Sequence, residues 1–275
     1  MQYVDFICFL LLDTHAILVH RWLYEHVGIL HRDLSLNNIM CRIIKEMNSA
    51  GVREVKEVYG VLTDYDLSSW TASLTSDYAK TSQQRTGTPP FMAHGLLGGT
   101  DTLHLYRHDV ESLFYIILIL ATHYEIEAPG EGKVGGVQMR QGFKELPYQA
   151  WFDKPSYKAL AYSKLGFFSN FHHFNLSPAF EDFRDWLEDI YLSFRRGIRS
   201  KDIHEDDLMS LRWRRDRASE DKVIPEFDDE TLAGHVHYSA LVDPVGNLEG
   251  ELKGLIVRYP PPLPPTSTGA ANADA

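Results

Sequence analysis

The feature that most limits how this chain can fold is a run of nine consecutive apolar residues at positions 113–121. A membrane-spanning helix needs about 17–25 such residues, so the run is too short to cross a bilayer. An apolar helix without a polar face is typical of a helix that is surrounded by protein. The sequence therefore predicts a domain whose packing centres on a buried helix over residues 110–122.

A polar segment over residues 31–40 reads His-Arg-Asp-Leu-Ser-Leu-Asn-Asn-Ile-Met. It places the carboxylate of Asp33 and the amide of Asn38 five residues apart, ahead of a strand-like apolar run. Phosphoryl transfer needs such a pair, because a carboxylate accepts the proton of an attacking hydroxyl while a neutral oxygen binds Mg²⁺. A turn that ends a helix also uses Asp, Ser and Asn, but it does not require this order of residues.

Residues 31–38 resemble the His-Arg-Asp-Leu-x-x-x-Asn catalytic loop of eukaryotic protein kinases. The resemblance implies that Asp33 is the catalytic base and that Arg32 and Ser35 are catalytic residues of the same loop. Ser35 stands where protein kinases usually carry a lysine, so a cation that would steady the transferring phosphoryl group is absent. The resemblance implies a structural role for His31.

Two further kinase-like segments follow in the expected order. Asp64 lies 26 residues after Asn38, at the place of the aspartate in the kinase Asp-Phe-Gly motif. The resemblance implies that Asn38 and Asp64 bind Mg²⁺ and, with it, ATP. Residues 85–93 resemble the end of a kinase activation segment, which would bring Thr88 beside Asp33 to shape the site for the substrate hydroxyl.

The start of the apolar helix narrows the resemblance further. Residues 108–115 read His-Asp-Val-Glu-Ser-Leu-Phe-Tyr, which differs from ordinary serine/threonine kinases. Together with residues 146–151 and 161–168, this segment resembles the fungal-type protein kinase family. The resemblance extends over about residues 11–194 and implies that Asp109 binds the backbone of the catalytic loop.

The fold that this resemblance implies is the large, C-terminal lobe of a protein kinase. It is mainly α-helical, with short β-hairpins around residues 29–30 and between residues 38 and 64. Residues 48–51 read Asn-Ser-Ala-Gly and predict the turn of the second hairpin. Apolar residues at helical spacing from Leu12 to Val27, followed by glycine, predict a helix that leads into the catalytic loop.

The small lobe of a kinase is expected to be missing from this sequence. Only 30 residues precede His31, and they contain neither a glycine-rich loop nor a lysine. These elements hold the phosphates of ATP in protein kinases. About half of the ATP site is therefore expected to be absent, so binding of Mg·ATP by this chain should be weak or undetectable.

Residues 130–137 match the sequence pattern of the kinase glycine-rich loop, Gly-x-Gly-x-x-Gly-x-Val. Such a loop needs a strand on either side and a lysine-bearing strand after it, and this stretch shows little strand alternation. We therefore interpret it as a surface insertion.

Two other departures from the kinase pattern weaken the catalytic interpretation. Asp66 replaces the glycine of Asp-Phe-Gly, which removes a flexible position and adds a negative charge. Residues 93–95 read Ala-His-Gly in place of Ala-Pro-Glu, which removes a carboxylate and leaves a buried arginine without its partner.

Composition restricts the class of protein. The net charge of −11, from 27 basic and 38 acidic residues, argues against general binding to nucleic acids or anionic membranes. Two cysteines, Cys8 and Cys41, are too few for a disulfide framework and favour a reducing compartment. No signal peptide or transmembrane segment is predicted, so we expect an intracellular protein, in the cytoplasm or nucleus. The histidines lack zinc-like spacing.

The expected organisation is a kinase-like lobe over residues 1–258, with its core at about 11–194 and a helical extension after it. Apolar residues at helical spacing predict a helix over residues 180–194, with basic residues 195–196 in its last turn. Residues 259–275 are proline-rich at their start and are expected to be disordered.

Three functions are consistent with these residues. The first is ATP-dependent phosphoryl transfer to protein serine and threonine hydroxyls, acting on a protein substrate, with the small lobe supplied elsewhere or by a partner chain. The second is a non-catalytic pseudokinase or scaffold, or a truncated kinase fragment, that binds a docking partner or associates with itself. A small-molecule phosphotransferase ranks third, because it would lack the activation segment at residues 87–93.

Overall fold

A buried helix, α3 (Tyr106–His123), forms the centre of the molecule, and all 18 of its residues are buried. It begins where the N–H of Leu105 donates to Nδ1 of His108 at 2.9 Å. Its apolar surface packs against aromatic side chains of α4 (Tyr157–Ser169) and α5 (Arg184–Arg214), among them Phe167 and Phe194. The predicted buried helix over residues 110–122 is therefore confirmed, and it extends four residues further at its start.

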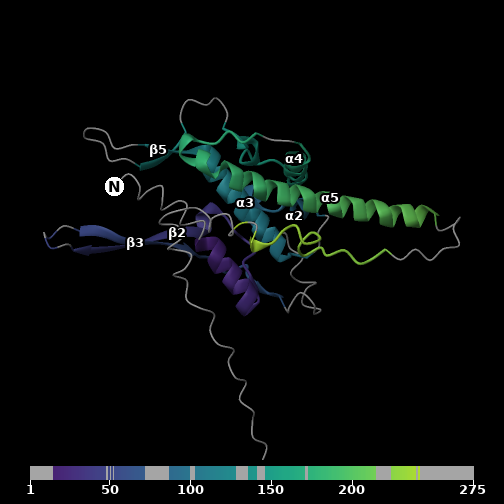
Figure 1. Ribbon diagram of the computed structural model, residues 1–275, viewed down its shortest axis with the longest axis horizontal. Helices are drawn as coiled ribbons and strands as arrows, with labels where there is room; N and C mark the ends of the chain where they lie inside the picture. Colours follow the sequence, from purple (N-terminus) through teal and green to yellow (C-terminus); the bar gives the residue numbers. More distant parts are fainter. Residues whose placement is uncertain are drawn as a thin grey trace, which may run out of the picture.

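Figure 1 shows this arrangement in a computed structural model, with α5 running across α3, α4 beside α5, and a long β-hairpin projecting to one side. The structure describes residues 15–47, 49, 51, 53–71, 87–99, 103–127, 136–140, 146–170, 173–214, 224–239 and 241. The architecture is mostly helical with two-stranded sheets, which is compatible with the fold expected from the sequence.

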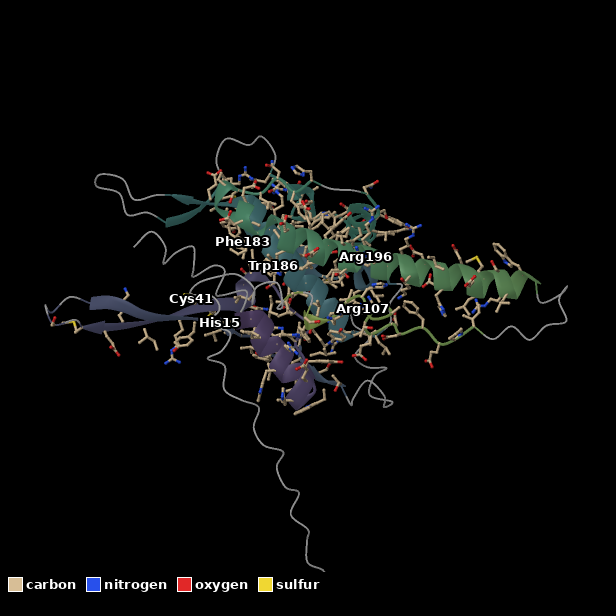
Figure 2. The ribbon with its side chains drawn as sticks, viewed as in Figure 1. His15, Cys41, Arg107, Phe183, Trp186 and Arg196 are labelled. Atoms are coloured by element: carbon tan, nitrogen blue, oxygen red, sulfur yellow. The ribbon has the colours of Figure 1, made fainter. Side chains whose placement is uncertain are left out.

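The projecting hairpin pairs β2 (Ile39–Met47) with β3 (Arg53–Leu62) in antiparallel register. The strands meet at the turn that the sequence predicts, between residues 47 and 53. They are nine and ten residues long and lie within residues 38–64, where the sequence predicts a hairpin. At its base the N–H of Gly60 donates to Nδ1 of His15 at 2.9 Å, while Cys41 on β2 is exposed (Figure 2).

The strand β1 (Ile29–Leu30) does not form a hairpin of its own, contrary to the prediction. It pairs with β4 (Ser69–Trp70), in register Ile29 with Trp70. Almost forty residues separate the two strands, so local turn signals could not reveal the pairing. The sheet joins the entry to the catalytic loop with the segment that follows Asp64.

A third sheet pairs β5 (Tyr124–Glu127) with β6 (Gly136–Met139). The glycine-rich pattern at residues 130–137 therefore lies between two strands and runs into the second one. This corrects the sequence interpretation, which found no strand there. Residues 128–135 lie outside the described residues.

The helix that leads into the catalytic loop is present over residues 15–22 and continues as a π-helical turn, η1 (Leu23–Val27). It ends at Gly28, which has a φ of 74° and donates its N–H to the carbonyls of Leu23 and Tyr24. Such a left-handed position favours glycine, and the predicted cap is confirmed. Leu12, where the predicted pattern begins, lies outside the described residues.

The helix predicted over residues 180–194 is wrong at both ends. Residues from Pro178 to Phe183 form a 3-10 helix, η7, and α5 then runs for 31 residues to Arg214. The first half of α5 is buried through side chains such as Trp186 and Phe194, whereas Trp213 near its end is 76% exposed. Figure 2 places Phe183 and Trp186 in the packed part of the molecule, and Figure 1 shows the distal half of α5 extending beyond it.

Short helices complete the fold: η2 (Leu36–Asn38), η5 (Pro89–Phe91), α2 (His94–Gly98) and η6 (Gln149–Trp151). Residues 224–241 return to the core, where Nε1 of Trp186 donates to the carbonyl of Leu241 at 2.9 Å. The predicted disordered tail at 259–275 lies outside the described residues. In the part of the chain that the structure describes, no helix is long and apolar enough to span a membrane.

Candidate active site

A carboxylate from the buried helix fixes the backbone of residues 31–32. Asp109, in the first turn of α3, accepts the N–H of His31 at 2.9 Å and the N–H of Arg32 at 3.2 Å. Arg32 has a φ of 70°, a conformation that costs energy in a residue with a side chain. The two hydrogen bonds stabilise this conformation, so the central helix sets the position of the loop. This is the contact that the sequence resemblance implied for Asp109.

Two histidines complete the surroundings of Asp109. Nε2 of His20 and Nε2 of His104 lie 2.8 Å and 2.7 Å from its two carboxylate oxygens. Burial alone would raise the pKa of Asp109, but the attraction and hydrogen bonds of His104 and His20 outweigh it and hold that pKa well below its usual value. Asp109 is therefore an anion in the core.

The His31 side chain joins the two halves of the site. Its Nε2 donates to the carbonyl of Thr63 at 2.9 Å, and its Nδ1 accepts the N–H of Asp33 at 3.3 Å. Burial lowers its pKa, which favours the neutral ring that this pair of bonds requires. The ring also packs on Tyr65, with centroids 4.8 Å apart. These contacts agree with the structural role predicted for His31.

Asn38 and Asp64 lie next to the paired ends of β2 and β3. Asn38 directly precedes β2, and Asp64 comes two residues after the end of β3. The N–H of Thr63 donates to the carbonyl of Asn38 at 2.9 Å, so Asp64 follows directly after the residue paired with Asn38. Nδ2 of Asn38 donates to the carbonyl of Asp33 at 2.8 Å, which leaves the amide oxygen available to a ligand. Asp64 has a φ of 63° and an exposed side chain.

These two side chains fit the protein's share of a Mg²⁺ site. Mg²⁺ prefers oxygen ligands and commonly binds through one or two carboxylates, with water and substrate phosphates supplying the rest. One carboxylate from Asp64 and one amide oxygen from Asn38 match that pattern. Among the described residues, no group of three or more His, Cys, Asp or Glu side chains could hold a metal ion by itself.

Thr88 lies beside Asp33, as the sequence predicted. Its N–H and its hydroxyl both donate to Oδ1 of Asp33 at 2.8 Å. Gly87 before it has a φ of 125°, and an added Cβ there would lie 2.9 Å from Cγ of Met92. A glycine is therefore required for the chain to bring Thr88 to the carboxylate.

Comparison with known proteins agrees with this geometry. Residues 10–121 match the model of the fungal protein kinase family. Over this segment the chain is similar to that family. The match includes the catalytic loop, Asp64, Thr88 and most of α3, and it ends before residues 146–168, where the sequence interpretation also saw a resemblance. No curated protein and no solved structure shows significant similarity to the chain.

Two further predicted site residues, Ser35 and Arg32, are buried. Ser35 is 1% exposed, and its hydroxyl has no hydrogen-bond partner among the described residues. Arg32 is 9% exposed, and burial lowers its pKa. Their catalytic roles remain predictions from the resemblance.

Sequence reasoning missed three residues that support the site. His20 and His104 hold Asp109, and the hydroxyl of Tyr238 donates to Nδ1 of His20. His20 follows Ala16 by four residues, so its position on the buried face of the helix was a usable signal. No local signal could have found Tyr238, which lies 218 residues from its partner in sequence.

The surface that the small lobe of a kinase would cover differs from the expectation. Because the small lobe is expected to be missing, the sequence predicts an exposed apolar surface around Ile39, Met40 and Leu62. Met40 is 55% exposed, Ile39 is half-buried and Leu62 is only 6% exposed. Leu62 was predicted wrongly because it faces the core cluster of this chain.

Proposed function

We propose that this chain supplies the large-lobe half of an ATP-dependent protein kinase site that phosphorylates serine and threonine hydroxyls of proteins. The observation that carries the proposal is the hydrogen-bonded unit of Asp33, Thr88 and Asn38, with Asp64 directly after Thr63, whose N–H donates to the carbonyl of Asn38. The similarity of residues 10–121 to the fungal protein kinase family supports it, since these residues occupy the corresponding motif positions.

Asp33 is the proposed base. Thr88 holds one of its carboxylate oxygens, Oδ1, through two hydrogen bonds. The second oxygen is then oriented to accept the proton of a substrate hydroxyl. Thr88 thus fixes the rotamer of the base, which contributes to rate because alignment of the reacting groups lowers the entropic part of the barrier.

Asn38 and Asp64 are the proposed ligands of Mg²⁺, through the amide oxygen and the carboxylate. When bound, Mg²⁺ would neutralise charge on the phosphates of ATP. The glycine-rich loop and lysine that clamp the phosphates in kinases are not in this sequence. We therefore expect this chain to bind Mg·ATP weakly, and to act within a longer product or with a small lobe from another chain.

Titration calorimetry at millimolar nucleotide tests this proposal. Wild-type chain should give weak heats with ATP that require Mg²⁺, and Asp64→Asn and Asn38→Ala should abolish them. Asp66→Asn is the matched control, because Asp66 is an exposed carboxylate two residues away that is not a proposed ligand. Binding that is independent of Mg²⁺, or equal in wild type and Asp64→Asn, would contradict the site.

A non-catalytic scaffold is the second candidate, and the buried Ser35 in place of the usual lysine favours it. This function predicts no nucleotide heat at any concentration, in wild type or in any variant. Micromolar affinity would contradict both candidates as stated, because it would require a phosphate clamp that neither contains.

A further inference from the structure

The end of the activation-like segment is held by a carboxylate that comes from α3. The sequence has Gly95 where protein kinases carry a glutamate. In the structure, Oε1 of Glu111 accepts the N–H of His94 at 2.8 Å and lies 3.0 Å from Nδ1 of the same residue. The hydroxyl of Tyr115, one helical turn further on, donates to the same oxygen at 2.6 Å. Glu111 is 1% exposed, so its carboxylate contacts this segment and is shielded from solvent.

A buried lysine holds the same segment from the other side. Lys164 on α4 is 0% exposed, and its Nζ donates to the carbonyl of Met92 at 2.5 Å. The Nζ also lies 3.9 Å from the centroid of the Tyr115 ring and 5.1 Å from that of Trp151. Burial lowers the pKa of Lys164 well below its usual value, and the negative charge of Glu111 offsets only part of this effect.

Lys164 and Glu111 meet at Tyr115 and hold the residues on either side of Ala93. A lysine is rarely buried unless it is paired, and simple packing would be served at lower cost by an apolar side chain. The sequence predicts a buried arginine that lacks its usual partner; among the described residues, the buried Arg107 pairs with Asp229, with Nη2 and Oδ1 3.2 Å apart.

We propose that Lys164 and Glu111 replace the missing glutamate–arginine pair and act as positioning residues for Thr88. The turn connects them, because the carbonyl of Thr88 accepts the N–H of Phe91 at 2.9 Å and the N–H of Met92 at 3.2 Å. Holding Met92 and His94 therefore holds Thr88 on Asp33. We call the contacts of Lys164 with Met92 and of Glu111 with His94 the anchor. The anchor is a property of the fold, whereas its effect on catalysis rests on the proposed kinase function.

Hydrogen exchange of the full chain, resolved by residue, tests the anchor without any assay of activity. In Lys164→Met, which keeps the length and apolar body of the side chain, the amides of Phe91, Met92 and Leu97 should exchange at least about tenfold faster. The amide of Thr88 should also shift in the NMR spectrum, because it donates to Asp33. Amides of α5 such as Leu187 should not change.

Two further variants keep the test decisive. Glu111→Gln preserves shape and should also open the segment, because His94 and Tyr115 lose the carboxylate that accepts their hydrogen bonds. The double variant should open the segment at least as much as either single variant, since the contacts with both Met92 and His94 are then weakened. Lys158→Met, an exposed lysine earlier on the same helix, is the control and should leave every rate unchanged.

Exchange at Phe91 and Met92 within about twofold of wild type in both single variants would overturn the proposal. Equal acceleration throughout α5 would also overturn it, because the two residues would then stabilise the whole domain rather than this segment. Failure of the nucleotide-binding test with a positive exchange result would remove the kinase function and leave the anchor in place.

Discussion

Substitution of the buried carboxylate of Asp109 is predicted to destabilise the protein strongly. Asp109→Asn keeps the size of the side chain but removes the negative charge of the carboxylate. Four hydrogen-bond donors contact that carboxylate, and they belong to His20, His104, His31 and Arg32. We expect the free energy of unfolding to fall by about 3 kcal/mol, because buried donors lose an anionic partner. Urea denaturation measures this, and Asp202→Asn on exposed α5 should change it by less than about 0.5 kcal/mol. A loss below about 1 kcal/mol in Asp109→Asn would contradict the central role of this carboxylate.

The titration of Glu111 predicts how stability depends on pH. Burial alone would raise its pKa, but the charge and hydrogen bonds of His94 and the Tyr115 hydroxyl outweigh it and lower that pKa from 4.5 to about 2. A lowered folded-state pKa contributes stability that is present above pH 4.5 and is lost as the pH falls toward 2. The shift corresponds to about 3 kcal/mol.

Unfolding measured from pH 7 to pH 3 in wild type and Glu111→Gln tests this. The difference in stability between the two proteins should narrow as the pH falls through that window. A constant difference would mean that Glu111 is not ionised in the folded protein near neutral pH.

At the scale of elements, alanine substitutions at two helical glycines should change the stability of the protein in opposite directions. An added Cβ at Gly197 in α5 would lie 2.7 Å from Cβ of Leu232, which is 1% exposed. Gly197→Ala should therefore destabilise the protein by about 1–2 kcal/mol, because overpacking exceeds the gain in helix propensity. At Gly166 in α4 nothing lies within 4 Å of an added Cβ.

Gly166→Ala should stabilise the protein by about 0.5 kcal/mol through helix propensity alone. Thermal unfolding of the two variants side by side measures both effects. A stabilised Gly197→Ala would show that residues 224–239 do not pack against α5 in solution.

At the scale of the whole molecule, exposed apolar side chains predict association. Met40 on the projecting hairpin is 55% exposed and Trp70 on β4 is 56% exposed. Exposed apolar surface of this kind marks an interface or an aggregation liability, so we expect the free chain to self-associate or to require a partner. Sedimentation at several concentrations should show a rising average mass, and Met40→Glu should reduce it. A clean monomer at tens of micromolar would contradict this expectation.

The sequence by itself determined the elements whose signals are local. The apolar run at residues 113–121 predicted α3, Gly28 predicted the end of the first helix, and the turn residues predicted the β2–β3 hairpin. The order of motifs around Asp33 and Asp64 predicted the kinase family. These signals need no tertiary information, because periodicity, capping and motif spacing are recorded in neighbouring residues.

Tertiary structure alone decided how distant residues complete the site. The pairing of Ile29 with Trp70, the contact of Tyr238 with His20 and the anchoring of Met92 by Lys164 join residues 41, 218 and 72 positions apart. The sequence predicted a helical extension after residue 194, but it did not show that this extension continues α5 without a break to Arg214, because the residues there are mostly charged. A missing Ala-Pro-Glu glutamate was visible in the sequence, but its replacement by Glu111 was not. The charge that stabilises a backbone segment can come from any element that packs against it, and only the fold specifies which one.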